Sequence, residues 1–509
     1  MVGLPIWAWS GAGIMEAWLG AYLETAPASI LVHASLDPQA RDLSYFQAIA
    51  LPAGLRLFGA VGMLGLILAR TSFVDRVVRM LREASDPRDL AALRMVVFFS
   101  LAVYASPWEI GRFAGLPPEL IVAPVGWGLL LQWLPPDPSW AVPLAWVFVG
   151  LAVAAGAGIA PRITAWGAVT AGIMVLGIPQ FYGKINHYHH LIWFAAVLAA
   201  SPAWDVWTVG WPPAGRKNPP TPRTRPDAST RYGRPLRWIW LLIGLIYFFP
   251  GYWKFVVAGP SWVDGTALGT MLQAQWYRVG IDPAVRFDLG ALSALAGIAV
   301  LTLEIGFVFA LVQRGMRSLF VCGAAAFHLA VFLVADINFW TLGVCLVAFV
   351  PVGRLLDGKA GQPAVSASKL RPAGRSWVAG GLASLALLAG FTGFDSWPVA
   401  VYPTFAGLPD TLYPTLILEV DGQRLDPYKS PAIARAFGPS RVMGLAWQLA
   451  RTDGPREARA AAVISALARY DATLASGDTV DAFLVHMIVA PGEIRSVREE
   501  RISRVIQSR

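Results

Sequence analysis

Repeated apolar stretches of about 20 residues run through this sequence, and they constrain its fold more than any other feature. A helix of that length crosses the hydrocarbon core of a bilayer. Apolar residues make up 56% of the chain and charged residues only 14%, which excludes an ordinary soluble enzyme. The expected fold is therefore an all-α polytopic membrane bundle. We predict ten spans, over residues 45–69, 93–111, 141–160, 163–181, 186–203, 236–256, 288–313, 317–335, 338–353 and 376–395.

Positive charge is concentrated in three segments between these stretches, at residues 70–94, 203–237 and 352–375. The positive-inside rule places such loops in the cytoplasm. The net charge of +9 therefore requires no nucleic acid as a partner, and the lipid bilayer is the expected surrounding. Four spans separate neighbouring basic loops if residues 119–134 do not cross, so we predict a re-entrant or interfacial half-helix there.

The same charge pattern predicts the orientation and the domain boundaries. The first 40 residues contain no Lys or Arg, which predicts an extracytoplasmic N-terminus without a cleavable signal peptide. A multi-pass protein of the cell membrane is expected. Its predicted parts are 1–87, an interfacial segment and the first span; 88–355, the main membrane domain with a cytoplasmic hinge at 204–235; 356–395, a loop and the last span; and 396–509, an extracytoplasmic domain.

The last 114 residues, 396–509, differ in pattern from the rest and predict a small α+β soluble domain. TLILEVDGQRL alternates apolar and polar residues and then carries the Asp-Gly pair of a tight hairpin turn. Residues 457–474 are alanine-rich and amphipathic, which predicts a helix, and AFLVHMIV predicts another strand.

Lys254 lies at the end of an apolar stretch, in FFPGYWKFVV. The chain has only six lysines among its 41 basic residues, so a lysine in this place is unusual for it. Unlike arginine, lysine can lose its proton when it is desolvated, which a general base must do. An ionisable residue near hydrocarbon is thus a candidate functional residue. The alternative is that Lys254 extends to the lipid headgroups and has no chemical role.

Further polar residues are expected near the depth of Lys254 or within the neighbouring spans. Together they predict an outward-facing polar pocket for a lipid-soluble substrate. The candidates are His187, His189 and His190 in NHYHH, Trp262 and Asp264 in the loop after Lys254, and Glu304 and His328 in the next two spans.

Each of these candidates also has a structural interpretation. The histidines of NHYHH could pack, relay protons or bind a metal, but two histidines without a third ligand do not predict a metal site. The only cysteines, Cys322 and Cys345, lie in apolar stretches and lack metal-binding spacing. Glu304 could simply pair with Arg56. Asp264 and Gly265 could serve only as a cap and a turn in the chain after Trp262.

Three motifs, in order, resemble vitamin K-dependent gamma-glutamyl carboxylase and its broader relatives, the HTTM membrane domains. GYWKF followed by SWVDG resembles the segment of that family in which a lysine precedes a Trp-Val-acid-Gly turn. NHYHHLIWF resembles the family's Asn-His pair at the start of a membrane helix. FHLAVFLVADINFWTLGV resembles a later histidine-bearing helix. The resemblance covers roughly residues 88–355.

The resemblance implies a carboxylase-like lyase and quinol oxygenase. Lys254 matches the lysine that deprotonates a reduced vitamin K-like quinone, the implied cofactor. His187 best matches the histidine that assists carboxylation of a protein or peptide glutamate by carbon dioxide, with His189 and His190 as alternatives. His328 matches a second histidine by its FHL context. The short segment after the last span departs from the large lumenal region of the carboxylase.

Two other functions stay open on the sequence. The first is a noncatalytic membrane protein that binds or assembles with another component through its outer domain. The second is a transporter, because Glu304, His328 and Arg56 lie within apolar stretches and residues 119–134 could form a half-helix. The sequence shows no inverted repeat, which counts against transport.

Overall fold

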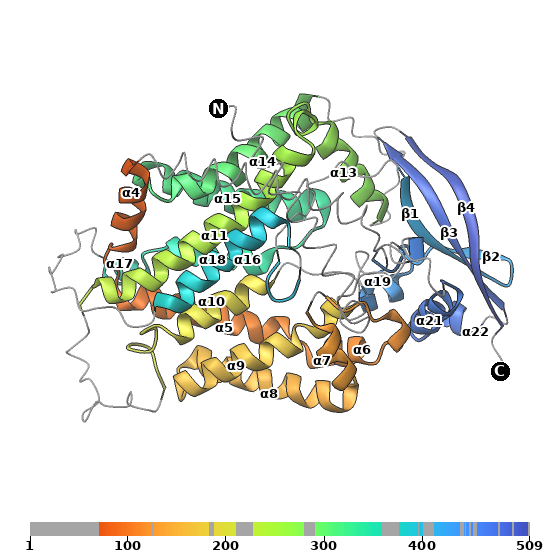
Figure 1. The fold of residues 1–509 in the computed structure, drawn as a ribbon, viewed down its shortest axis with the longest axis horizontal. Helices are drawn as coiled ribbons and strands as arrows, with labels where there is room; N and C mark the ends of the chain where they lie inside the picture. The colour runs from red at the N-terminus through yellow and green to blue at the C-terminus, as the bar shows by residue number, and fades with distance from the viewer. Residues whose placement is uncertain are drawn as a thin grey trace, which may run out of the picture.

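The structure is a computed structural model. It describes residues 71–124, 126–182, 188–209, 227–278, 291–358, 376–394, 396–400, 412–437, 442, 444–446, 449–450, 456–476, 479–490 and 493–506. These residues form a mostly helical bundle with a small antiparallel sheet beside one end of it (Figure 1). The expected combination of an apolar helical bundle with a small α+β part is therefore confirmed.

Five helices in the described part of the chain are long and apolar enough to cross a membrane. They are α8 (Pro138–Ala157), α9 with η2 (Pro161–Phe181), α11 (Thr230–Val257), α14 (Ala291–Ala310) and α15 (Arg314–Ala335). The successive helices α5 (Pro87–Tyr104) and α6 (Pro107–Ala114) meet at a bend of 48° and count as a sixth if they form one span.

The structure does not support ten spans. The predicted run 45–69 lies outside the described residues, and three other runs form only shorter apolar helices. These are α10 (His189–Ala199), α16 (Trp340–Cys345) with η3 (Leu346–Phe349), and α18 (Ser376–Thr392). The 11 residues of α10 extend about 16 Å, against about 30 Å of hydrocarbon. Every residue of α10 is buried, so its apolar character reflects a place inside the bundle.

Proline and capping residues define several helix boundaries. Ser106 caps α6 and Asp137 caps α8, and a proline follows each cap at the first helical position. In the described part of the predicted half-helix, 119–134, the helical residues belong to η1 (Pro118–Leu120), which begins one residue earlier, and to the six-residue α7 (Gly128–Trp133). Four further helices of the bundle are α4 (Thr71–Leu81), α12 (Pro260–Val263), α13 (Thr266–Arg278) and α17 (Val352–Asp357).

The long helix α11 packs along α14 and α18 in the middle of the bundle (Figure 1). Two glycines of α11, Gly244 and Gly251, face α14. A Cβ atom at Gly251 would lie 2.7 Å from Cβ of Glu304, and one at Gly244 would lie 2.8 Å from a methyl group of Leu311. The small residues thus allow the two helix backbones to approach closely.

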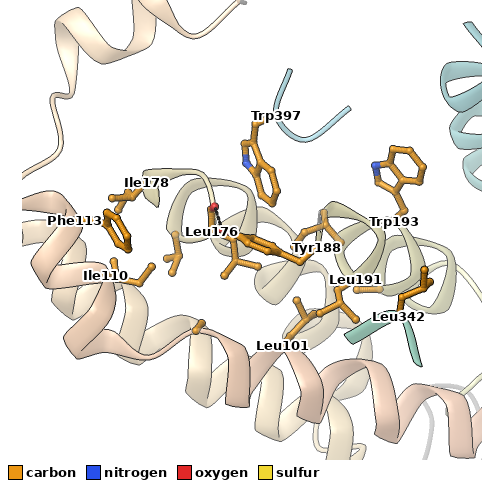
Figure 2. Packing of buried hydrophobic residues seen from close by; sticks show 14 of the residues in the cluster. Leu101, Ile110, Phe113, Leu176, Ile178, Tyr188, Leu191, Trp193, Leu342 and Trp397 are labelled. Atoms are coloured by element: carbon orange, nitrogen blue, oxygen red, sulfur yellow. Dashed lines mark hydrogen bonds between the residues drawn. The ribbon is translucent and has the colours of Figure 1, made fainter. Parts of the chain in front are cut away.

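Aromatic side chains hold the segment after α18 against the middle of the bundle. The Tyr188 ring lies 4.3 Å from the Tyr104 ring and 5.5 Å from the Trp397 ring, between centroids. The Tyr188 hydroxyl donates a hydrogen bond to the Leu176 carbonyl at 3.1 Å (Figure 2). Trp397 Nε1 donates to the Ile173 carbonyl at 2.7 Å, so this segment is fixed to the helix ends of α9 and α10.

The described strands form one antiparallel sheet of order β2-β1-β3-β4. They are β1 (Leu412–Val420), β2 (Gln423–Leu425), β3 (Thr479–Ala490) and β4 (Glu493–Ile506). Asp421 and Gly422 have φ of 48° and 83°, and Val420 pairs with Gln423. Positive φ at both turn residues is typical of a two-residue hairpin loop, so the predicted Asp-Gly turn is confirmed.

Short helices accompany the sheet and connect it to the bundle. The helix predicted at 457–474 is two helices, α21 (Arg456–Ala468) and α22 (Ala472–Ser476), because Asp471 accepts a hydrogen bond from the Thr473 amide and starts a new helix. α19 (Pro431–Phe437) precedes them. Arg469 donates to the Gly115 carbonyl at 2.7 Å, and α13 contacts β3, so the sheet stands at the α6 and α13 end of the bundle (Figure 1).

Candidate functional site

Lys254 and Glu304 form a buried ion pair between α11 and α14. Lys254 Nζ lies 2.5 and 2.7 Å from the two carboxylate oxygens of Glu304. Each side chain is only 5% exposed. The pair is therefore shielded from water, and each of the two charges has the other as its partner.

Trp262 covers the pair from the chain that follows α11. Gly259 ends this helix with a φ of 44°, and Pro260 begins α12, which carries Trp262. Lys254 Nζ lies 5.1 Å from the centre of the Trp262 ring, a distance at which a cation and an aromatic face attract each other. A Cβ atom at Gly297 of α14 would collide with the Trp262 carbonyl, so the glycine allows this packing.

The surroundings of Trp262 are apolar. The indole is 1% exposed and lies in a small cluster with Ala258, Ala267 and Leu301. Its Nε1 has no hydrogen-bond partner among the described residues. A buried N–H group without a partner carries a desolvation cost, which an oxygen of a bound molecule would remove.

The sequence left a purely structural role open for Lys254, at the lipid headgroups, and for Glu304, in a pair with Arg56. Lys254 does not extend to a surface, because its side chain is buried and bonded to Glu304. Both Glu304 oxygens accept from Lys254, whereas the alternative partner Arg56 lies outside the described residues. The place of Lys254 in the last turn of α11 is favourable, because the C-terminal end of a helix attracts positive charge.

His328 belongs to a second polar pair in the same region. Its Nε2 lies 2.5 Å from the hydroxyl of Tyr247, which the sequence reasoning did not select. Tyr247 stacks on Phe307 of α14, with ring centroids 4.6 Å apart. Tyr247 precedes Lys254 by seven residues, or two helical turns, so both lie on the same face of α11. That spacing is the sequence signal by which Tyr247 could have been selected. Tyr247 and Lys254 therefore lie about 10 Å apart along α11, and their partners are His328 of α15 and Glu304 of α14.

The other histidines lie at the start of α10. His189 and His190 are fully buried, and their rings lie 4.7 Å from the Trp193 ring and 5.7 Å from the Phe194 ring. His187 lies outside the described residues, so the predicted meeting of His187 with Lys254 is not described. No three His, Cys, Asp or Glu side chains are grouped to hold a metal within the part of the chain that the structure covers.

Asp264 has the local role that its structural alternative predicts. Its Oδ1 accepts a hydrogen bond from the Thr266 amide at 2.8 Å, at the start of α13. This hydrogen bond lowers the pKa of Asp264. Gly265 follows with a φ of 84°, a conformation that glycine adopts without strain. Asp264 is thus a capping residue next to the site and is not bonded to Lys254.

Comparisons with protein-family models, with curated proteins and with solved structures found no match.

Proposed function

We propose that this protein is an integral membrane enzyme that removes a proton from an apolar hydroxylic substrate of the hydroquinone class, at Lys254 and Glu304. The observation that carries the proposal is the bonded, buried pair beneath the Trp262 ring. Ionisable side chains inside an apolar bundle are costly, and they mark functional sites by default. The motif resemblance to the carboxylase supports the same residue, Lys254.

The pair changes how a base can act here. A lysine that holds its proton cannot accept another, whereas the Glu304 carboxylate can. When Glu304 accepts a proton, Lys254 stays an ammonium group and balances the negative charge left on the substrate oxygen. If Lys254 first passes its proton to Glu304 and then accepts the substrate proton, the final state is the same. The two residues therefore act as one base, and neither suffices alone.

The chemistry of the residues around the pair supports a reduced quinone as the substrate. The face of Trp262 and the apolar side chains Leu301 and Met271 suit a flat apolar ring, and the unpartnered Trp262 Nε1 can donate to a ring oxygen. When bound, a reduced quinone would supply a hydroxyl proton and reducing electrons for reaction with oxygen.

Carboxylation belongs to the same proposal as its second half. Because α13, which follows Lys254 and α12 in the chain, contacts β3, we assign the sheet the role of holding a glutamyl peptide (Figure 1 labels α13 and β3). In this scheme His187 assists the addition of carbon dioxide. Orientation with the Lys254 end of α11 outside the cell membrane, as the basic loops predict, is part of the proposal.

The test is quinol oxidation by the full chain in lipid nanodiscs, with a reduced naphthoquinone and oxygen and with mass spectrometry of the product. Lys254→Met and Glu304→Gln should each lower the rate about 100-fold or more, because both members make up the base. Lys429→Met, which removes an exposed lysine of the C-terminal part, is the matched control and should keep the full rate.

Two further measurements make the result decisive. Thermal unfolding of each variant shows whether lost activity reflects lost structure, and Glu304→Asp keeps the charge if Glu304→Gln does not fold. Incorporation of labelled carbon dioxide into a glutamyl peptide tests the carboxylation step separately. Full oxidation by a folded Lys254→Met variant would refute the proposal.

A further inference from the structure

A group of arginines lies at the opposite end of α11 from Lys254. Arg237 on α11, and Arg314 and Arg317 at the start of α15, surround one carboxylate, that of Glu83 just after α4 (Figure 1 labels these helices). Their nitrogens lie 3.3, 3.1 and 3.6 Å from the Glu83 oxygens. We refer to these four residues as the arginine cluster.

Arg237 is buried, Arg317 is partly buried, and the two flank a single tryptophan. The side chains of Arg237 and Arg317 are 8% and 16% exposed, while Arg314 is 82% exposed. The guanidinium carbons of Arg237 and Arg317 lie 3.7 and 4.4 Å from the centre of the Trp240 ring. Trp240 is itself fixed by a 2.8 Å hydrogen bond to the Ala348 carbonyl. The cluster is therefore held in a defined place by packing.

The cluster has more positive charge than it can neutralise. Three guanidinium groups share one carboxylate, which leaves an excess of two charges, and Arg237 Nη1 is buried without a partner among the described residues. Asp89 also attracts Arg237, but it is shared with Arg354 and Arg88 and accepts from the Gly353 amide, so the cluster keeps a net positive charge. Buried cations without full compensation are unfavourable, so an added anion would stabilise the cluster.

We propose that the arginine cluster binds a phosphate-type anion, either the headgroup phosphate of an anionic lipid or free phosphate. Guanidinium groups match phosphate oxygens in geometry and charge. The N-terminal end of α15, which begins at Arg314, adds partial positive charge. Since α11 and α15 are apolar helices that both begin at this end, the site lies where a lipid headgroup would meet the bundle.

The experiment uses the full chain in detergent, with native mass spectrometry and thermal unfolding. Phosphatidylglycerol should bind and raise the unfolding midpoint more than phosphatidylcholine does. Arg314→Gln with Arg317→Gln should weaken that binding about 30-fold. The matched control, Arg76→Gln with Arg79→Gln, removes the same charge from exposed positions on α4 and should leave binding unchanged.

A second variant acts in the opposite direction. Glu83→Gln removes the competing carboxylate and should strengthen anion binding several-fold, which a purely structural ion-pair cluster would not do. Displacement of phosphatidylglycerol by millimolar inorganic phosphate assigns the site to free phosphate, and no displacement assigns it to the lipid. The proposal fails if the two lipids bind equally, or if the control variant loses as much binding as the cluster variant.

Discussion

The buried Lys254–Glu304 pair predicts a large and strongly non-additive effect on stability. At 2.7 Å, two unit charges attract by about 6 kcal/mol at the effective dielectric constant of about 20 that describes protein sites. Desolvation of both groups offsets most of this energy. Removal of one partner leaves the other charge buried alone and should cost about 3–5 kcal/mol of the free energy of unfolding. Lys254→Met and Glu304→Leu together should cost far less than either change alone.

The assay is a double-mutant cycle on the full chain in mixed micelles, with unfolding by a denaturing detergent followed through tryptophan fluorescence. The two single variants and the double variant should give an interaction energy of about 3 kcal/mol or more. Lys429→Met is the control, because Lys429 and Asp426 are 3.9 Å apart and the lysine is 63% exposed; it should change stability by less than about 0.5 kcal/mol. If the double variant lost the sum of the two single losses, the pair would not be coupled and the reasoning would be wrong.

Three further predictions concern other contacts. Gly251→Val should destabilise the bundle by about 1–3 kcal/mol, because its Cβ would meet Glu304 at 2.7 Å and separate the helices; thermal unfolding checks this. Tyr247→Phe should cost about 1 kcal/mol through the lost hydrogen bond to His328, with the unfolding midpoint as the measurement. The hydrogen bond from Arg504 lowers the pKa of Asp481, so its stabilisation is complete above the ordinary carboxyl pKa of about 3.9 and is lost as pH falls through the lower folded value. Asp481→Asn should remove this acid dependence from unfolding curves measured between pH 2 and 6.

The sequence predicted local features well where one physical rule decides them. The turn at Asp421 and Gly422 needs positive φ at two positions, and that pair of residues supplies it. The strand β4 was missed because EIRSVREERISRVI carries many charges. Charged residues are common in edge strands, and β4 lies at the edge of the sheet. Its strand conformation is stabilised by backbone pairing with β3, which the composition of the segment does not predict.

The span count failed because hydropathy does not separate lipid-facing helices from helices buried in protein. α10 is apolar after its first two residues, His189 and His190, and is fully buried, while only a third of the apolar window of α8 is buried. Both look the same in a hydropathy pattern. Helix length was the better guide, since α10 is too short to cross.

The candidate site was predictable only residue by residue. Lys254 and Glu304 both stood out as charges in apolar stretches, but they are 50 positions apart, and the packing of α11 on α14 joins them. The sequence instead favoured a neutral lysine beside histidines. Tyr247 was missed because a tyrosine in an apolar helix is ordinary until its partner His328 is known.

The positions of the two charged sites on α11 link the two proposals. Arg237 and Lys254 are 17 residues apart on one helix, which places them about 26 Å apart along its axis. The hydrocarbon core is about 30 Å thick, so a membrane-crossing α11 brings the two sites to opposite boundaries of the bilayer. An anion bound at the arginine cluster would then fix the depth of α11. Under the proposed function, that depth would set Lys254 and Glu304 at the level of the hydroxyl group of a lipid-dissolved hydroquinone. Loss of the arginine cluster should then weaken quinol oxidation, although the residues of the base are unchanged.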